Sequence, residues 1–312
     1  MADLVIRPLT AGEEHVFDSM PDPQPELRQV GYADGLAGGG YRPEHTWIAQ
    51  LDGQVVARAA WLLPPGSVGR PWLERFDLTA EPSVGAALLA AAHRSLGGPT
   101  GYYASMPASW RQVPHQQAAA RPPMAAARLA GLVEQGERLR MAWTGTPVAP
   151  GSDRRALRSA ADAAETGARC TFRPAADVAE IEALTARVGE PDVLTGAEIA
   201  RLVRGVDLAR EPLKWLSGPP GDWRVALVDG EPVGLTGPAG DACYPMIAYL
   251  GLLDPPDPAV RAEMLADAVS GLVAGGALEI VADVDADRPG VRADLERTAF
   301  APVRSRVHFA PA

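Results

Sequence analysis

The stretches WIAQLDGQVVA (residues 47–57) and WRVALVDGEPVG (residues 223–234) decide the fold of this chain. In each stretch, two runs of strand-forming residues meet at an Asp-Gly pair, Asp52-Gly53 or Asp229-Gly230. Asp-Gly readily adopts the positive φ angles that a two-residue hairpin turn needs. The sequence therefore predicts two β-hairpins that share one motif and lie 177 residues apart.

Three further stretches repeat in the same order at nearly the same offset. The matches pair LVIRP (4–8) with TFRP and its preceding Cys (170–174), PSVGAALLA (82–90) with PAVRAEMLA (258–266), and ERLRM (137–141) with VRSRV (303–307). Each match alone would be chance, but four matches in order favour two copies of one domain. We predict an N-terminal domain at residues 1–143, a linker at 144–168 and a C-terminal domain at 169–312.

Each copy has a pattern typical of an α/β (α+β) domain. Val178, Ile181 and Leu184 recur at helical spacing, and Asp177 precedes them as an N-cap. Further helices are predicted at 84–96 and 259–274, and a last strand in each copy at 138–143 and 303–309. We expect a mixed, mostly antiparallel sheet flanked by helices in each copy.

Composition narrows the classes of function. The net charge of -10 argues against a DNA-binding surface, because an acidic surface repels phosphate backbones. The two cysteines, Cys170 and Cys243, form no CxxC pair and the five histidines show no metal spacing, so we expect no metal. The most apolar helical run, residues 84–92, is too short to span a bilayer. With no signal peptide visible, a cytoplasmic location is expected.

The order of predicted strands and helices in each copy resembles that of the GNAT superfamily of acyl-CoA-dependent N-acyltransferases. Two short motifs carry the resemblance, Ile6-Arg7-Pro8 at the start and Asp-Gly-x-x-Val-Gly at 229–234. The duplicated form resembles the tandem GNAT proteins common in actinobacteria. The resemblance implies two domains, each with a sheet splayed near its fourth and fifth strands. It also implies acetyl-CoA as the acyl donor and a small-molecule amine as the acceptor.

The resemblance further implies that a loop of the type Arg/Gln-x-x-Gly-x-Gly/Ala holds the cofactor pyrophosphate at a helix N-terminus. In the first copy it places Val84, Gly85 and Ala86 there. In the second copy it places Val260, Arg261 and Ala262 there, with pantetheine along Leu250, Leu252 and Leu253. Both loops depart from the pattern. The first Gly of the motif is Ser83 in the first copy. In the second, Pro258 removes an N–H donor while Asp254 and Asp257 add negative charge.

Two residues are candidates for catalysis. Glu74, in the fourth strand of the first copy, is the predicted general base, and Asp77 is the second candidate. Glu74 shares a face with Trp72 and Phe76 if Leu73, Arg75 and Asp77 face the other side. The alternative is a salt bridge from Glu74 to Arg70 or Arg75. Tyr249, in the second copy, is either a substrate contact or a core aromatic. The tyrosine that commonly protonates the leaving thiolate in this family is replaced by residues near Leu129 and Leu295.

The leading hypothesis is direct, acetyl-CoA-dependent acetylation of a small-molecule amine, with the acceptor site in the second copy and the first copy as scaffold. One alternative is a catalytically degenerate GNAT pseudoenzyme that binds a ligand or partner. Another is an acyltransferase whose donor is a carrier protein or an aminoacyl-tRNA. We expect no membrane association, and either a monomer with pseudo-two-fold domains or a homodimer. The glycine-rich run at 35–40 is expected to be a flexible lid.

Overall fold

Both Asp-Gly pairs form the predicted hairpin turns. The φ angles are 48° at Asp52 and 51° at Asp229, and 83° and 85° at the glycines that follow. The first turn joins β2 (Thr46–Leu51) to β3 (Gln54–Leu62), and the second joins β9 (Arg224–Val228) to β10 (Glu231–Ala239). Positive φ at both central residues is the geometry that the Asp-Gly signal predicts.

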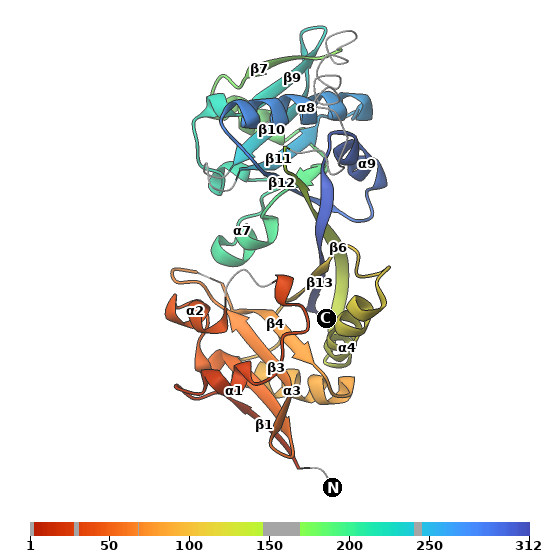
Figure 1. Cartoon of the computed structure of the whole chain (residues 1–312). Coiled ribbons are helices and arrows are strands. Elements are labelled where there is room, and N and C mark those ends of the chain that lie inside the picture. Colours follow the sequence, from red (N-terminus) through yellow and green to blue (C-terminus); the bar gives the residue numbers. More distant parts are fainter. Residues whose placement is uncertain (1–2, 28–30, 68, 146–168, 240–244) are drawn as a thin grey trace. The chain divides into compact units, whose positions relative to one another are not determined.

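The computed structural model describes residues 3–27, 31–67, 69–145, 169–239 and 245–312. Most of the predicted linker and Cys243 lie outside these residues. The chain divides into two units (Figure 1). Unit 1 comprises Met1–Arg138, Leu202–Arg204 and Arg304–Ala312, and unit 2 comprises Leu139–Arg201 and Gly205–Val303.

The two halves of the sequence contain corresponding elements in the same order. The other strands are β1 (Leu4–Pro8), β4 (Trp72–Leu78), β5 (Tyr102–Pro107), β6 (Leu132–Trp143), β7 (Thr171–Pro174), β8 (Val193–Leu194), β11 (Met246–Leu252), β12 (Ile280–Asp285) and β13 (Ala301–Pro311). The helices are α1 (Glu14–Asp18), α2 (Tyr32–Ala37), α3 (Pro82–Ser95), α4 (Pro114–Leu129), α6 (Val178–Thr185), α7 (Ala197–Arg204), α8 (Pro258–Ala274) and α9 (Pro289–Arg297).

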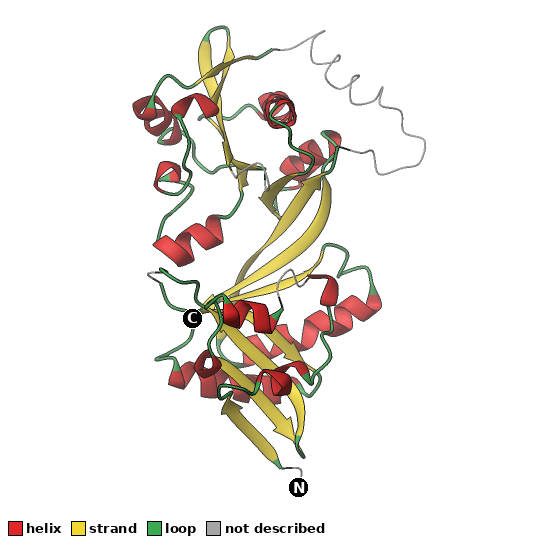
Figure 2. Ribbon diagram, turned by 60° about the vertical axis from the view of Figure 1, so that its left-hand side comes forward, coloured by secondary structure: helices red, strands yellow, loops and turns green. Residues whose placement is uncertain are grey.

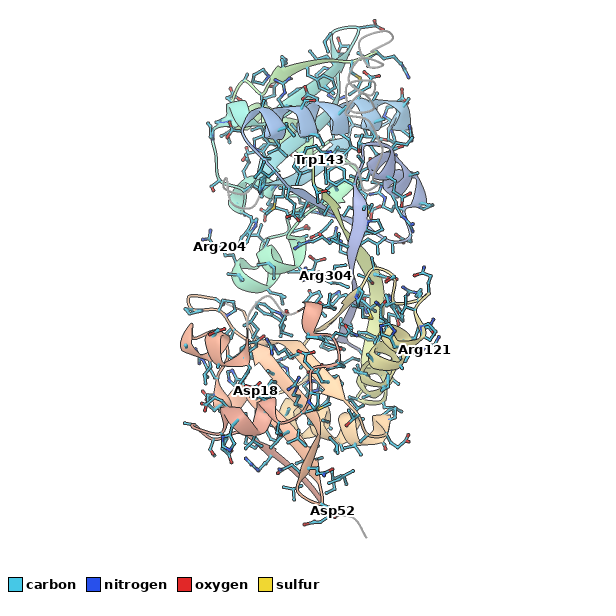
Figure 3. The ribbon with its side chains drawn as sticks, viewed as in Figure 1. Asp18, Asp52, Arg121, Trp143, Arg204 and Arg304 are labelled. Carbon is cyan, nitrogen blue, oxygen red and sulfur yellow. The ribbon has the colours of Figure 1, made fainter. Side chains whose placement is uncertain are left out.

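The last strand of each sequence repeat is divided between the units, since residues 139–143 of β6 belong to unit 2 and residues 304–311 of β13 belong to unit 1. The strand order is β1-β2-β3-β4-β5-β13 from unit 1 and β7-β9-β10-β11-β12-β6 from unit 2. Figure 2 shows the strands in yellow and the helices in red. In unit 1, β13 pairs antiparallel with β5 from Arg304 opposite Pro107 to Phe309 opposite Tyr102. Figure 3 labels Arg304, where unit 1 resumes. The predicted boundaries at 143 and 169 stay predictions, and the units differ from the sequence repeats at their last strands and at Leu202–Arg204, which belongs to unit 1.

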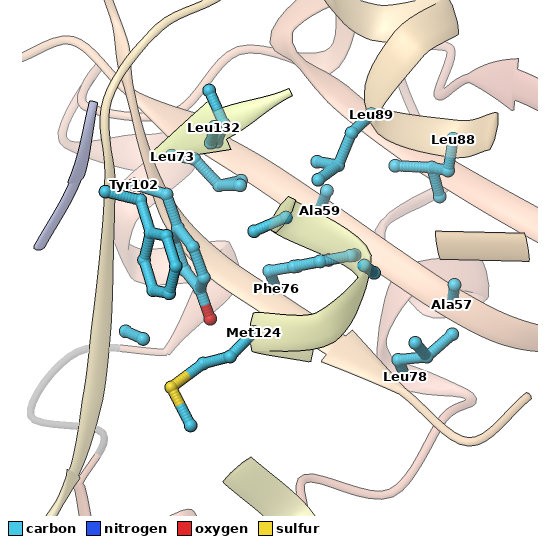
Figure 4. Packing of buried hydrophobic residues seen from close by; sticks show 14 of the residues in the cluster. Ala57, Ala59, Leu73, Phe76, Leu78, Leu88, Leu89, Tyr102, Met124 and Leu132 are labelled. Atoms are coloured by element: carbon cyan, nitrogen blue, oxygen red, sulfur yellow. The ribbon is translucent and has the colours of Figure 1, made fainter. Parts of the chain in front are cut away.

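Unit 1 has helices on both faces of its sheet. On one face, Leu88 and Leu89 of α3 and Met124 of α4 pack with Leu73 and Phe76 of β4 in the main core (Figure 4). On the other face, a smaller cluster joins Phe17 of α1 and Tyr32 of α2 to Ile48 of β2. The alternation along β2 and β3 produces the two faces, because successive side chains point to opposite sides of a strand.

Unit 2 repeats this arrangement. Val260 and Leu265 of α8 and Leu295 of α9 pack with Ile247 and Ile280 in one core. Ile181 and Leu184 of α6 pack in a second core, which confirms the predicted helix face at these two positions. The predicted N-cap is confirmed as well, because the Asp177 side chain accepts a hydrogen bond from the Glu180 backbone N–H. Val178, in contrast, is exposed.

The glycine-rich run at 35–40 is not the flexible lid that the sequence suggests. Its first residues belong to α2, and the turn that follows is closed by backbone hydrogen bonds from Gly40 and Tyr41 to the Gly35 carbonyl. A Cβ atom at Gly35 would lie 2.4 Å from the Tyr41 ring. Glycine is therefore needed at this position for close packing rather than for mobility.

An arginine–glutamate clamp follows the first strand of both repeats. The Arg7 guanidinium bonds to Glu13 at 2.7 Å, and that of Arg173 bonds to Glu180 at 2.9 Å. Glu13 also accepts a hydrogen bond from the backbone N–H of Thr10, and Glu180 accepts one from that of Ala176. These guanidinium and backbone hydrogen bonds lower the pKa of both glutamates to about 2. The shared clamp is independent structural support for the duplication.

The two clamps make the stability of the fold depend on pH. Because both folded-state pKa values lie below the ordinary value of 4.5, the ionised clamps stabilise the fold above about pH 4.5, and this contribution is lost as the pH falls towards 2. The urea midpoint should therefore fall over this range, and less so in the Glu13→Gln, Glu180→Gln variant. Carbon-13 NMR of the two side chains provides the direct check, and titration near pH 4.5 would contradict the clamp.

The hairpin glycines provide a second test. Gly53 and Gly230 have positive φ and no atom within 4 Å of an added Cβ, so alanine there is strained by the backbone alone. Gly53→Ala and Gly230→Ala should each reduce the free energy of unfolding by about 1–2 kcal/mol. Gly136→Ala is the control, because that glycine is equally open and does not have positive φ. Equal urea midpoints for all three variants would contradict this account.

Candidate functional site

A β-bulge in β4 positions Glu74. Ala60 pairs with Arg75 and Trp61 pairs with Leu73, so Glu74 is the extra residue between two consecutive pairs. A bulge reverses the alternation of side chains along the strand. Leu73 consequently packs in the main core with Phe76, and the predicted grouping of Leu73 with Arg75 and Asp77 is wrong.

β4 and β5 diverge beside this bulge. They are parallel neighbours joined by one bridge, between Leu73 and Tyr102. Beyond it lies a small pocket, with a cavity volume of about 30 Å³, that opens to solvent on one side. The pocket is lined by Glu74, Phe76 and Asp77 of β4, residues 102–106 of β5, Ala119, Ala120 and Pro123 of α4, and Pro23 and Gln24.

The pocket has an apolar part and a polar part. Phe76, Tyr102 and Met106 line it and belong to the main core beneath α3 and α4. Glu74, Asp77, Gln24 and Ser105 supply carboxylate, amide and hydroxyl groups. The divergence thus brings an apolar surface and a carboxylate to one opening, which no single strand could do.

Glu74 is half-buried and accepts a hydrogen bond from the indole N–H of Trp72 at 3.1 Å. Arg70, one of its two predicted ion-pair partners, donates instead to the carbonyl oxygens of Leu96, Gly98 and Pro99. The structure therefore places the predicted general base at the pocket wall, without the salt bridge to Arg70.

Asp77 has a structural partner. Its carboxylate accepts a hydrogen bond from Nε of the buried Arg58 at 2.8 Å. The same guanidinium donates to the carbonyl oxygens of Phe17 and Met20. This ion pair offsets the charge of Asp77 and fixes the segment that leads to Gln24. Among the two carboxylates at the pocket, Glu74 is the better candidate for proton transfer.

The β5 wall of the pocket is backed by the exchanged strand. Tyr103 stacks on His308 with ring centroids 4.6 Å apart, and Tyr102 stacks on Phe309 at 5.7 Å. Both partners belong to β13, from the second sequence repeat. Sequence reasoning missed these tyrosines because their partners lie about two hundred residues away, although the aromatic pairs Tyr102-Tyr103 and His308-Phe309 were visible.

The predicted cofactor residues of the first repeat lie at the start of α3. The backbone N–H of Val84 donates to the Glu81 carbonyl. A Cβ atom at Gly85 would lie 2.8 Å from Ala126, so glycine lets α3 approach α4 closely. Val84, Gly85 and Ala86 do not line the described pocket, and their contact with a cofactor stays a prediction.

Unit 2 has the same strand divergence but fills it with its own chain. β11 and β12 share one bridge, between Met246 and Val281. Beyond it, β8 pairs antiparallel with β11, which places Leu194 opposite Tyr249 and Val193 opposite Leu250. We call residues 187–195 the plug, because they extend along β11 from Leu253 back to Ala248.

The plug takes up the backbone groups that a pantetheine arm would need. The N–H of Asp192 donates to the Leu250 carbonyl at 2.8 Å, and that of Thr195 donates to the Ala248 carbonyl at 2.9 Å. Leu250, Leu252 and Leu253 are buried in the two cores of unit 2. The predicted pantetheine groove along these leucines is therefore occupied by protein.

Arg261 is not available as a phosphate contact. Its guanidinium bonds to Asp192 of the plug at 2.6 Å and to Asp294 of α9 at 2.7 Å, and Asp192 also pairs with Arg288. Burial alone would lower the pKa of this guanidinium, but the two carboxylates outweigh it and raise that pKa. The carboxylate of Asp192 thus interacts with the residue that was predicted to bind a phosphate.

The rest of the predicted loop in unit 2 is closed as well. Val260 is buried in the core and Ala262 is partly buried. The Asp257 side chain caps α8 by accepting the Ala259 N–H at 3.0 Å. The helix N-terminus, where an anion is favoured, already has a carboxylate.

Tyr249 is a core residue of unit 2. It is fully buried, its ring lies 5.7 Å from that of Trp223, and burial raises the pKa of its hydroxyl. These observations agree with the alternative of a core aromatic, and the contact of Tyr249 with substrate stays a prediction. Glu74 and Tyr249, the two predicted catalytic residues, belong to different units.

Replacing Arg261 tests this view of unit 2. Arg261→Ala should reduce the free energy of unfolding by about 1.5–3 kcal/mol, because Asp192 and Asp294 lose their shared cation and keep only Arg288 and Arg297 as partners. Arg292→Ala removes an exposed pair with Glu296 and should cost about 0.5 kcal/mol or less. Urea unfolding measures both. A stable Arg261→Ala variant that has lost affinity for CoA would show that Arg261 binds the donor.

No group of three or more potential metal ligands is found within the described residues. In the same part of the chain, no helix combines the length and the apolar character needed to cross a bilayer.

Comparisons with known proteins identify the fold. No protein-family profile and no curated protein matches the chain. A GCN5-related N-acetyltransferase from Sphaerobacter thermophilus is 13% identical, with a TM-score of 0.56, and the match covers 98% of this chain and 94% of that one. A tandem GNAT protein from the clavulanic acid biosynthesis pathway is 16% identical over 98% of both chains, with a TM-score of 0.46.

A GNAT-family acetyltransferase from Colwellia psychrerythraea is 10% identical, with a TM-score of 0.45, over 99% of this chain and all of that one. The similarity to the Sphaerobacter structure shows that this chain has the GNAT fold along nearly its whole length. The repeated element order shows that the fold occurs twice.

Proposed function

We propose that this chain, which has the GNAT fold, is an N-acyltransferase whose active site is the β4–β5 pocket of unit 1. The reaction is direct transfer of an acetyl group from acetyl-CoA to the amine of a small molecule. One observation carries the proposal: the divergence of β4 and β5 forms an open pocket with an apolar part and a half-buried carboxylate. The acceptor site, predicted in the second repeat, is assigned here to the first.

The chemistry of the pocket suits its two parts. The apolar residues Phe76, Tyr102 and Met106 provide a surface for the acyl end of the donor. Glu74 takes a proton from the amine, directly or through water, because only a neutral amine attacks a thioester. The C–N bond forms, the C–S bond breaks, and the thiolate leaves.

Protonation of the leaving thiolate has no dedicated group on α4. This helix contributes Ala119, Ala120 and Pro123 to the described lining, and none of them carries an acidic proton. Leu129, near the position of the family's tyrosine, is 65% exposed at the end of the helix. We assign the proton to solvent, which reaches the open side of the pocket.

The fit to acetyl-CoA is good at its acyl end and weaker at its phosphate end. The start of α3 still offers backbone N–H groups around Gly85 and Ala86, and a helix N-terminus favours an anion. No basic side chain lies in the first turn of α3, where the family's Arg or Gln would be near. A donor without a pyrophosphate, such as an acylated carrier protein, is the second candidate that this observation favours.

Unit 2 takes a supporting role in this proposal. Its plug and its capped α8 match the pseudoenzyme description, whereas unit 1 does not. The second repeat contributes β13, which backs the pocket wall of unit 1. The cytoplasmic location and the choice between monomer and homodimer stay predictions.

Glu74→Gln tests the mechanism. Removal of a general base should lower kcat by about 10²–10⁴-fold while the affinity for acetyl-CoA stays the same. Glu44→Gln is the matched control, because Glu44 is an exposed glutamate of unit 1 outside the pocket and should leave kcat unchanged. Acetyl transfer to a panel of primary amines, followed by release of free thiol, is the measurement.

The same assay distinguishes the donors. If the pyrophosphate is held, acetyl-CoA should have a much lower KM than S-acetyl-N-acetylcysteamine, which lacks the nucleotide. Equal KM values would favour a donor without pyrophosphate. Absence of turnover and of binding with both thioesters would contradict the proposed function.

A further inference from the structure

β5 contributes to the pocket of unit 1 from both of its faces. Tyr102 belongs to the main core together with Phe76 of β4 (Figure 4), and Met106 lies on the same side of β5. Because side chains alternate along a strand, Tyr103 and Ser105 belong to the opposite face. The hydroxyl of Ser105 is therefore on the face of the sheet that is turned away from the main core.

β13 continues this second face beside β5. In the antiparallel register, His308 lies opposite Tyr103 and Arg306 lies opposite Ser105. Side chains directly opposite each other in such a pair share a face, and their Cβ atoms are about 4.5–5.5 Å apart. The stack of Tyr103 on His308, with ring centroids 4.6 Å apart, confirms the shared face for that pair. Two residues along each strand, Arg306 therefore lies beside Ser105, which lines the pocket.

Arg304 shows what this face of β13 is directed towards. Its guanidinium donates to the Leu27 carbonyl at 3.4 Å. Leu27 ends the short 3-10 helix that follows Gln24, and Gln24 lines the pocket. Arg306 lies on the same face, between Arg304 and the stacked His308, so its side chain is on the side of the sheet that faces this segment.

The guanidinium of Arg306 has no hydrogen bond or ion pair within the described residues, and the side chain is half-buried. Arg58, in contrast, uses its guanidinium for Asp77 and for two backbone carbonyl oxygens. A partly desolvated guanidinium interacts most strongly with a carboxylate or a phosphate, to which it can donate two parallel hydrogen bonds. Arg306 is therefore available to an anionic group of a ligand beside the pocket.

From this arrangement, and resting on the proposed function, we infer that the acceptor is an amino acid, whose carboxylate binds to Arg306 while its amine faces Glu74. The strand order β4-β5-β13 places the carboxylate of Glu74 and the guanidinium of Arg306 on strands that flank β5. A ligand with a positive and a negative end matches these two charges. The pocket is small and opens to solvent, so it encloses the amino end of such a ligand rather than the whole molecule.

The phosphates of the donor are the other anions that a guanidinium could bind. The proposed donor surface, however, lies on the face of the sheet that holds the main core, where Leu88 and Leu89 of α3 pack with Phe76 and Tyr102. Arg306 lies on the opposite face, so the sheet separates it from the start of α3. This separation favours the acceptor over the donor as the ligand of Arg306.

Matched pairs of ligands test the inference. Alanine and ethylamine, ornithine and putrescine, and tyrosine and tyramine differ only by the carboxylate. Calorimetric titration of the full chain, without any acyl donor, should show that at least one amino acid binds about tenfold to a hundredfold more tightly than its partner amine. With acetyl-CoA present, kcat/KM should follow the same order.

Arg306→Gln should bring the binding ratio close to one, because the charge that binds the carboxylate is lost, and Arg306→Lys should retain part of the preference. Arg94→Gln is the control, because Arg94 is an exposed arginine of unit 1 outside the pocket, and it should leave the ratio unchanged. The urea midpoint and the affinity for CoA should stay nearly the same in all three variants.

Equal, weaker or undetectable binding of every amino acid, or an unchanged ratio in Arg306→Gln, would overturn the inference. A loss of CoA affinity in Arg306→Gln would assign Arg306 to the donor and overturn it as well. Selective binding of amino acids without acetyl transfer would refute the proposed function alone. Acetyl transfer to amines and amino acids with equal kcat/KM would refute the inference alone.

Discussion

Two parallel strands that share one bridge and then diverge leave backbone groups without partners in the sheet. Such groups must be satisfied by other protein atoms, by water or by a ligand. Both halves of this chain face this constraint, at Leu73–Tyr102 in unit 1 and at Met246–Val281 in unit 2. Unit 1 leaves a pocket at the divergence, and unit 2 inserts residues 187–195. The proposal that unit 1 holds the active site and that unit 2 supports it rests on this difference.

Ion pairs hold the plug of unit 2 in its place along β11. The plug presents Asp192 to Arg261, which in turn pairs with Asp294, so replacing Arg261 would remove the cation that these two buried carboxylates share. The last strand of the second repeat, β13, links the two repeats by pairing with β5 of the first. Without β13, β5 would be an open sheet edge, and the tyrosines of the pocket wall would lose their aromatic partners. The two repeats are thus interdependent.

Local signals in the sequence predicted local structure well. The Asp-Gly hairpins and the Asp177 cap depend on a few adjacent residues, and the repeats indicated the duplicated fold. Glu74 was found because a carboxylate among apolar residues is visible in sequence. The bulge beside it, the pairing of Asp192 with Arg261, and the stacking of Tyr103 on His308 were not predictable, because each depends on a partner that is distant in sequence. The strand exchange was hidden for a related reason: β6 and β13 have equivalent patterns, so neither indicates which sheet it joins.

The most direct test of this account is a crystal structure of the full chain with bound CoA. We expect one cofactor per chain, with its thiol end in the pocket between Glu74 and Tyr102 and with the plug of unit 2 in place. A cofactor beside Leu252 and Arg261, with residues 187–195 displaced, would contradict the assignment of the active site to unit 1.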